Sequence, residues 1–279
     1  MAHSYCRAAE DLVRGGGSDA PRWQGLALST HFQPIFGVRR ATCVGYEALV
    51  RAVDPQDRPV SPQELFARAF AEGRGVELDW VCRALHLRSF ARVDPGDRKL
   101  FINVHAQAAV QDVACAADFA DLVRFYGLVP RRVCVEILED SCIDERMLRD
   151  TVAAHRRSGA AIAMDDFGIG CSNLDRIVAL RPDLVKIDRS ILIDAVGDEK
   201  ARSMLPVIVE LLHEAGSHVV VEGIESANEA LIAIDSGADK LQGFYFAQPA
   251  AGLADEGYGA SVITRLMRMR AGGFAAVGA

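Results

Sequence analysis

The sequence lacks any apolar run of the roughly 20 residues that a helix needs to cross a bilayer, which excludes a transmembrane helix. Its opening residues, MAHSYCRAAEDLVRGGGS, also lack the consecutive hydrophobic residues that form the core of a secretory signal peptide. From these two absences we predict a cytoplasmic protein that makes no membrane contact through this chain.

The cysteines are few and irregularly placed. The seven cysteines are odd in number, and no two of them have the CxxC spacing. This pattern argues against a disulfide framework and against a structural zinc site. We therefore expect reduced thiols that pack like small apolar side chains, at positions 6, 43, 82, 115, 134, 142 and 171.

Positive charge is also in short supply. The 31 Lys and Arg residues are outnumbered by 38 Asp and Glu residues, which gives a formal net charge of −7. This balance disfavours nonspecific binding to a nucleic acid polymer or to an anionic membrane surface. A small phosphate-containing substrate is still compatible with it, because an acidic protein can bind one through metal ions instead of a basic patch.

What the chain does contain is enough apolar sequence for a large core. Half of its 279 residues are apolar and a quarter are charged, and this length is ordinary for one α/β barrel. Residues 1–26 include a Gly-Gly-Gly-Ser run and Pro21, which predicts a flexible segment or linker. We expect order from near Leu28, one barrel domain over 27–272 and a disordered tail over 273–279.

Apolar, β-rich runs alternate with amphipathic helical patterns along the rest of the chain. The predicted strands are 30–38, 43–51, 99–105, 132–138, 160–166, 183–188, 218–224 and 240–246. The predicted helices are 62–73, 76–92, 115–126, 144–158, 199–215, 226–236 and 254–270. From residue 99 onward the strands are short and apolar on both faces, as buried parallel strands are. Repeated β-then-α units of this size predict an α/β fold of the TIM-like (β/α)8 barrel class.

The first two predicted strands differ from the others. Only about four residues separate 30–38 from 43–51, which is enough for a hairpin but too few for a helical crossover. We therefore predict one antiparallel strand near the N-terminus of the barrel.

Polar residues interrupt the apolar strands near their ends, where the active-site residues of a parallel barrel collect. They are Glu47, Asn103, Glu136, Asp165, Asp166, Lys186, Glu222 and Gln242. A single residue of this kind is usually a helix cap or a surface residue. A full set at successive strand ends is expected to converge on one mouth of the barrel.

Five members of this set are carboxylates. Clustered like charges raise one another's pKa and cost stability unless cations balance them, and Lys186 alone is not enough. Carboxylates with an amide carbonyl form an all-oxygen ligand set, which favours Mg²⁺ or Mn²⁺ over zinc. Two such ions suit phosphodiester hydrolysis, with the adjacent Asp165 and Asp166 as a bridge between them. Ca²⁺ prefers longer bonds, so we expect it to hold substrate and to inhibit.

Further motifs stand in order around these positions. Glu47-Ala48-Leu49 is followed by Val50-Arg51. The other segments are QPI at 33–35, FINVH at 101–105, VEILE at 135–139, MDDFGIGCSNL at 164–174, DLVKID at 183–188, VVEGIES at 220–226 and LQGFYFAQP at 241–249. Together they resemble the EAL-domain phosphodiesterases, which hydrolyse cyclic di-GMP to linear pGpG. A lone Glu-Ala-Leu tripeptide carries no weight, but the ordered set spans about residues 28–250.

The resemblance implies a role for each matched position. The implied ligands of two Mg²⁺ or Mn²⁺ ions are Glu47, Asn103, Glu136, Asp165, Asp166 and Glu222. The implied catalytic residues are Lys186, Glu222, Glu225 and Gln242. In this assignment Lys186 orients the attacking water, and Glu225 contacts the metal ligands without binding metal itself. The implied substrate contacts are Gln33, Leu49 and Arg51, and Glu139 is the implied anchor of the loop after Asp166. The resemblance also implies a homodimer formed beside that loop.

The sequence departs from the family pattern within that loop. The family motif DFGxGYSSL reads DFGIGCSNL here, so Cys171 replaces an aromatic residue and Asn173 replaces a serine. No metal-ligand position is lost. The effect of the two replacements on the catalytic rate is left open.

Several nearby residues have plain structural interpretations. Asp188 either faces the same side as Lys186 or caps the next helix. His105 is interpreted as a structural or rim residue, and Phe244 and Tyr245 as barrel wall in preference to base-stacking residues.

We therefore predict metal-dependent hydrolysis of cyclic di-GMP. One alternative is a catalytically inactive cyclic di-GMP receptor or protein-interaction domain; such relatives typically lose acidic ligands, and all of them are present here. Another is an unrelated two-metal barrel hydrolase, which the ordered motif set disfavours.

Overall fold

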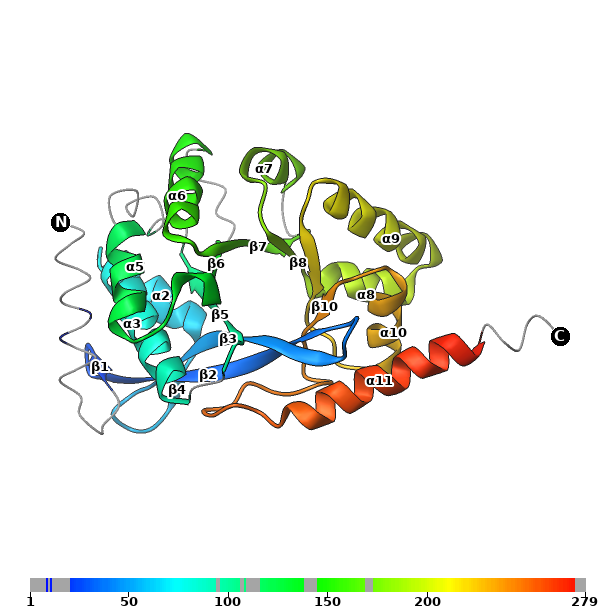
Figure 1. Cartoon of the computed structure of the whole chain (residues 1–279). Coiled ribbons are helices and arrows are strands. Elements are labelled where there is room, and N and C mark those ends of the chain that lie inside the picture. Colours follow the sequence, from blue (N-terminus) through cyan, green and yellow to red (C-terminus); the bar gives the residue numbers. More distant parts are fainter. Residues whose placement is uncertain are drawn as a thin grey trace. The chain divides into compact units, whose positions relative to one another are not determined.

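The computed structural model describes residues 9, 11, 21–93, 96–105, 108, 116–137, 145–168 and 173–273. Figure 1 labels the helices and strands along the chain, which divides into two compact units. The first comprises Met1–Phe32 and Glu47–Ile162, and the second comprises Gln33–Tyr46 and Ala163–Ala279. Among the described residues, no helix combines the length and the apolar composition that a bilayer span requires.

The first unit contains two helix pairs and most of the early strands. Its strands are β1 (Arg22–Trp23), the start of β2 (Leu26–Gly37), the end of β3 (Thr42–Val53), β4 (Pro59–Val60), β5 (Lys99–Val104) and β6 (Val133–Ile137). Its helices are α2 (Pro62–Ala71), α3 (Gly75–Val93), α5 (Ala116–Phe125), the 3₁₀ turn η2 (Pro130–Arg132) and α6 (Glu145–Ser158). Helix α2 packs on α3, and α5 packs on α6.

Local sequence explains these elements. Helix α2 begins after Ser61, whose hydroxyl accepts a hydrogen bond from the backbone N–H of Glu64, and Pro62 occupies its first turn. Every residue of β6 is buried, which is why the strand is apolar on both faces apart from Glu136. Strands β5 and β6 run parallel, with Asn103 opposite Glu136.

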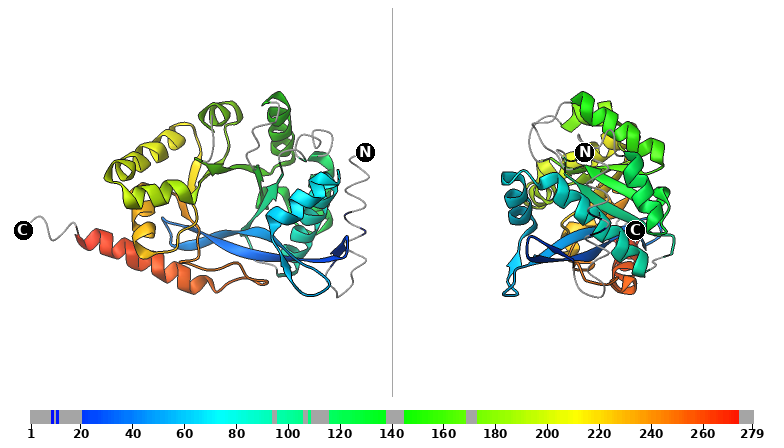
Figure 2. Two further views of the ribbon diagram at one scale, coloured as in Figure 1. Left: turned by 180° about the vertical axis from the view of Figure 1, so that it is seen from behind. Right: turned by 90° about the vertical axis from the view of Figure 1, so that its left-hand side faces the viewer.

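The second unit carries the later strands with their helices. Its elements are β7 (Ala161–Phe167), α7 (Asn173–Leu180), β8 (Leu184–Ile187), α8 (Arg189–Gly197), α9 (Glu199–Glu214), β9 (His218–Val221), α10 (Ala227–Asp235), β10 (Lys240–Leu241) and α11 (Glu256–Gly273). Helix α8 contacts α9 and α10, and α10 also contacts α11 (Figure 2). Aspartates cap α8 and α9, and Ser226 caps α10.

The hydrogen-bonded order of the strands is β1-β2-β10-β9-β8-β7-β6-β5-β3-β4, and an additional pairing of β2 with β3 closes a ring of eight strands. Strand β2 pairs antiparallel with β10, whereas β7 through β10 pair in parallel. The fold is therefore the (β/α)8 barrel class with an antiparallel strand near the N-terminus, and both predictions are confirmed.

The predicted elements differ from the structure in a few places. Helices α7 and α8 were not predicted. Helix α8 was missed because it is short and only Asp198 separates it from α9, ending one helix and capping the next. The prediction of a strand over 240–246 is wrong beyond Leu241, where the chain turns. The prediction of order from near Leu28 starts too late, since β1 precedes it and Trp23 is buried.

Candidate functional site

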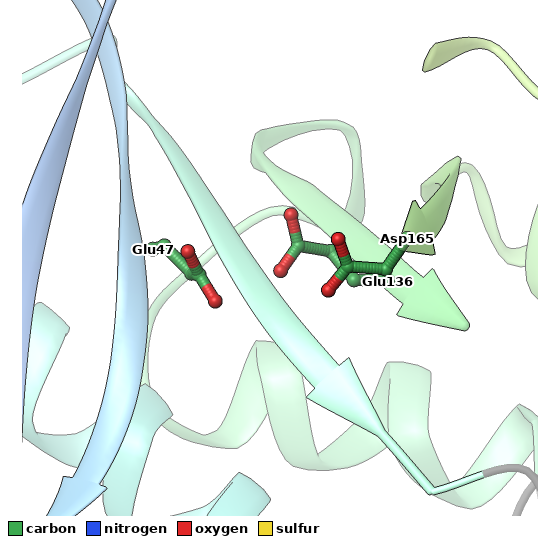
Figure 3. Close-up of side chains that lie close together, drawn as sticks. All are labelled: Glu47, Glu136 and Asp165. Atoms are coloured by element: carbon green, nitrogen blue, oxygen red, sulfur yellow. The ribbon is translucent and has the colours of Figure 1, made fainter. Parts of the chain in front are cut away.

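Three polar side chains of the first unit project from β3, β5 and β6. Glu47 and Glu136 are buried, and one carboxylate oxygen of Glu47 lies within 4.8 Å of one of Glu136. Asn103, the register partner of Glu136, donates a hydrogen bond from Nδ2 to Glu47 Oε1 at 2.7 Å. Figure 3 draws the two glutamates and also labels Asp165, which belongs to the second unit.

The amide of Asn103 fits a role as a metal ligand. Its Nδ2 is used by Glu47, whereas its buried Oδ1 has no hydrogen-bond partner among the described residues. A buried carbonyl oxygen without a partner is costly unless a cation or a donor occupies its lone pairs. Two carboxylates and an amide oxygen form a hard-oxygen donor set of the kind that Mg²⁺ and Mn²⁺ accept.

The EAL motif itself lies on β3. Because strand side chains alternate, Glu47, Leu49 and Arg51 project from the same face. Burial lowers the pKa of Arg51, and the neighbouring charge of Glu47 acts in the opposite direction. The structure thus brings an arginine, expected to contact substrate, close to a carboxylate expected to bind metal.

The paired aspartates of the second unit form a bulge in β7. Met164 is opposite Val185 of β8 and Phe167 is opposite Ile187, so two aspartates on β7 face Lys186 alone on β8. Asp166 adopts a left-handed backbone with φ of 55°, and its N–H donates to Asp165 Oδ1 at 3.0 Å. Bulges of this kind re-aim side chains at a strand end.

Lys186 joins two carboxylates of the second unit. Its side chain is 1% exposed, and its Nζ lies 3.2 Å from Asp165 Oδ1 and 2.6 Å from Glu222 Oε1. The ammonium compensates carboxylates that burial would otherwise disfavour as anions. The sequence-based grouping of Asp165, Lys186 and Glu222 is therefore seen in the geometry.

A cavity of about 260 Å³ opens beside Glu222. It is lined by Gln33, Arg189, Glu222, Gly223, Glu225, Gln242, Gly243 and Phe244. Gln242 Nε2 donates to Gln33 Oε1 at 3.2 Å, and Gln33 Nε2 donates to the carbonyl of Ala247 at 3.2 Å. The two glutamines are thus oriented by a short chain of amide hydrogen bonds, and the cavity collects four residues that the sequence had marked: Gln33, Glu222, Glu225 and Gln242.

Arg189 lines this cavity but was missed by the sequence analysis. Its guanidinium lies 2.8 Å from Glu225 and 3.3 Å from Glu229. Burial raises the pKa of Glu229, but hydrogen bonds from the Glu225 N–H and from Arg189 outweigh burial and lower it overall. The signal that could have revealed Arg189 is its place directly after DLVKID, at the start of α8.

Asp188 caps α8, accepting from the N–H of Ser190 at 2.7 Å. Phe244 is 54% exposed at the cavity, so its assignment to the barrel wall is wrong; Phe246 is the buried ring. Glu139 and Cys171 lie outside the described residues, as does the side chain of Asn173.

Comparison with known proteins places the chain in a family. The EAL domain model matches residues 23–249, so the chain belongs to the EAL-domain family. A cyclic di-GMP phosphodiesterase of Pseudomonas aeruginosa is 32% identical over 224 residues, covering 78% of this chain and 38% of that protein. An uncharacterised protein of Azorhizobium caulinodans is 34% identical over 239 residues, covering 81% of this chain and 32% of that protein. The chain spans about a third of the length of such curated relatives.

Solved structures share the fold. BlrP1 of Klebsiella pneumoniae, in complex with calcium and cyclic di-GMP, has a TM-score of 0.73 and 26% identity, covering 81% of this chain and 57% of that one. A manganese and cyclic di-GMP complex of the same protein matches with a TM-score of 0.72 at the same identity. A standalone EAL protein of Vibrio cholerae bound to cyclic di-GMP has a TM-score of 0.74 and 25% identity, covering 82% of this chain and 94% of that one.

Proposed function

We propose that the chain is a divalent-metal-dependent phosphodiesterase that hydrolyses cyclic di-GMP to linear pGpG. The observation that carries the proposal is that the EAL-family acids and amides are all present and form two ordered clusters. Glu47, Asn103 and Glu136 form one, and Asp165, Lys186 and Glu222 form the other. The relatives named as cyclic di-GMP phosphodiesterases support the substrate assignment.

We propose that six side chains hold two Mg²⁺ or Mn²⁺ ions: Glu47, Asn103, Glu136, Asp165, Asp166 and Glu222. When bound, such ions polarise the phosphate and lower the pKa of a bound water. The donor set supports this, because its members are oxygen ligands and Asn103 Oδ1 is a buried acceptor without a partner among the described residues.

We propose that Lys186 and Glu222 control the attacking water and its proton. The net reaction adds water across one of the two phosphodiester bonds: an O–P bond forms, and the bond from phosphorus to the ribose oxygen breaks. Lys186 Nζ is held by Asp165 and Glu222, where a charged donor can orient the attacking water. Glu222 lies at the cavity wall, where its carboxylate can accept a proton from that water.

Substrate recognition would fall to polar residues of the cavity and of β3. Gln33 and Gln242 are preoriented in the cavity by their mutual hydrogen bond. Arg51 projects from the same face of β3 as Glu47, and its planar fork suits a phosphate or a guanine edge. Glu225 acts from the cavity rim, paired with Arg189.

The test is an assay of pGpG formation from cyclic di-GMP by anion-exchange chromatography, with Mg²⁺, Mn²⁺, Ca²⁺ or EDTA. We expect product with Mg²⁺ and Mn²⁺ and none with Ca²⁺ or EDTA. The calcium and cyclic di-GMP complex of BlrP1 supports the expectation that Ca²⁺ holds substrate. Cyclic di-GMP binding without any pGpG would favour the inactive-receptor alternative, and product in EDTA would contradict the metal requirement.

We also propose that the protein forms a homodimer beside the loop after Asp166. Helix α7, which follows that loop, exposes apolar side chains: Leu174 is 49% exposed and Val178 is 70% exposed. Exposed apolar side chains grouped on one helix favour an association surface. Light scattering should show a dimer that Val178→Glu converts to a monomer; a monomer at every micromolar concentration would contradict the proposal.

A further inference from the structure

Helix α3 contains an ion pair that is almost fully buried. The side chains of Asp79 and Arg83 are 2% and 0% exposed, and Arg83 Nη2 lies 2.5 Å from Asp79 Oδ2. The guanidinium also lies over the Trp80 ring, 4.8 Å from its centroid, and near Phe119 of α5 at 5.7 Å. Removing both charges from water offsets most of their attraction, and apolar residues of similar size are often as stabilising. A positional role therefore accounts for the pair better than stability does.

The other carboxylate oxygen of Asp79 reaches the end of a strand. Asp79 Oδ1 accepts a hydrogen bond from the backbone N–H of His105 at 2.9 Å. His105 is the first residue after β5, whose ladder with β6 ends at Val104. Its N–H therefore lies beyond the ladder, and a helix side chain supplies the acceptor. The His105 ring also packs against Phe70 of α2, with 4.2 Å between ring centroids.

Asn103 lies two residues before His105, in the last part of β5 that leads directly into this strand end. The direction of Asn103 Oδ1 depends on the backbone at this strand end and on the hydrogen bond from Nδ2 to Glu47. Ligand groups must be held within about 0.5 Å and 10–20° of their working geometry. A strand end without its acceptor would loosen that geometry.

We propose that Asp79 is a positioning residue: held by Arg83, it fixes the end of β5 and thereby aims Asn103 Oδ1 at a bound divalent cation. The inference rests on the metal site of the proposed function, and it assigns a role to a buried pair that touches neither metal nor substrate.

The experiment compares two double variants, Asp79→Asn with Arg83→Met and Asp79→Leu with Arg83→Met. Both remove the two buried charges, and asparagine and leucine have the same number and branching of non-hydrogen side-chain atoms, but only asparagine keeps an acceptor for the His105 N–H. Mn²⁺ binding is measured by electron paramagnetic resonance. Hydrogen exchange is carried out on the metal-free protein and read out in the peptide that covers Asn103 to His105. Glu77→Gln on the same helix, which weakens the ion pair between Glu77 and Arg74, is the control.

We expect the asparagine double variant and the control to bind Mn²⁺ within about twofold of the parent. The leucine double variant should bind about tenfold more weakly, the usual cost of losing an outer partner of a ligand, and should exchange faster at His105. Equal Mn²⁺ binding and equal exchange in the two double variants would overturn the inference.

If the leucine double variant fails to fold, Asp79→Glu replaces it, because glutamate keeps the charge but displaces the acceptor. Weaker Mn²⁺ binding by Asp79→Glu supports the inference, and unchanged binding overturns it. Both readouts are taken without substrate. A parent that binds Mn²⁺ but forms no pGpG would therefore contradict the proposed function alone.

Discussion

The two polar clusters are built on different chemistry. In the first unit, Asn103 donates a neutral amide hydrogen to Glu47 and neighbours Glu136 in register. In the second, the ammonium of Lys186 pairs with both Asp165 and Glu222. An amide directs the carboxylates without changing the charge, whereas an ammonium also neutralises them. Asn103 is therefore expected to govern metal affinity, and Lys186 to govern the rate of the chemical step.

The largest expected effect is that of Lys186→Met. We expect kcat to fall about 10²–10⁴-fold, the usual contribution of a positioned proton-handling group, while Mn²⁺ binding is retained. Removing a buried cation leaves two carboxylates uncompensated, so the metal-free variant should also be less stable and should regain stability with Mn²⁺. Rate and calorimetry are compared with Lys200→Met, an exposed lysine. Turnover by Lys186→Met at the parental rate would contradict the claim that Lys186 governs the rate of the chemical step.

Asn103→Leu should give the reverse pattern. Loss of its oxygen is expected to weaken Mn²⁺ binding at least as much as loss of an outer-shell partner, about 10–100-fold, whereas kcat at saturating Mn²⁺ falls less. Asn103→Asp keeps an oxygen ligand and should retain more of the affinity. A Mn²⁺ titration of pGpG formation measures both quantities. A leucine variant with parental metal affinity would remove Asn103 from the ligand set.

The units also differ in their histidines. His155 on α6 is buried, and burial followed by the charge of Arg83 lowers its pKa to about 3. In the second unit, the side chains of His213 and His218 are 38% and 66% exposed and lie beside Asp239. Because the folded pKa of His155 lies below its ordinary value of 6.5, the unfolded chain binds the proton first. Stability is therefore lost as the pH falls from about 6.5 towards 3.

We accordingly expect His155→Phe to reduce the loss of unfolding free energy between pH 7.5 and pH 5 by about 2 kcal/mol. Phenylalanine keeps the edge contact with Phe119 and cannot be protonated. Urea unfolding at the two pH values measures the difference, with His213→Gln as the exposed control. Equal pH dependence of the parent and His155→Phe would show that His155 is not a source of acid sensitivity.

The smallest expected effect is at the cavity rim. Arg189 and Glu225 have side chains that are 30% and 50% exposed, so the pair is worth roughly 0.2–1 kcal/mol. Arg189→Met should change kcat/KM by no more than about fivefold, mainly through KM. If Arg189 acts through Glu225, the effects of Arg189→Met and Glu225→Gln will not add in the double variant. Additive effects would show that Arg189 and Glu225 act independently.

Much of the barrel could be predicted from the sequence, because its signals are local. Val/Ile-rich runs predicted β5 to β9, and the four-residue connection predicted the antiparallel strand. Helix α7 was missed because its eight residues give little more than two turns for a periodic pattern, and α8 because only Asp198 separates it from α9.

The site shows the same limit. The residue types and their order predicted the polar set, but the bulge that places two aspartates opposite Lys186 depends on a register shift with no sequence signature. Arg189 was missed because its role depends on contacts with Glu225, in the loop after β9, and with Glu229 on α10. Asp79 was missed for a similar reason, since a helix residue meets a strand end only through tertiary packing.

The most direct test of the account follows pGpG formation from cyclic di-GMP by the parent, Glu136→Gln and Glu210→Gln across a Mn²⁺ titration. Glu136 is fully buried in the first cluster, whereas Glu210 lies on the exposed side of α9. We predict Mn²⁺-dependent product from the parent and Glu210→Gln, and none from Glu136→Gln at Mn²⁺ concentrations that saturate the parent. Product formation by Glu136→Gln at the parental rate and Mn²⁺ midpoint would contradict the assignment of a metal-dependent phosphodiesterase site to these strand ends.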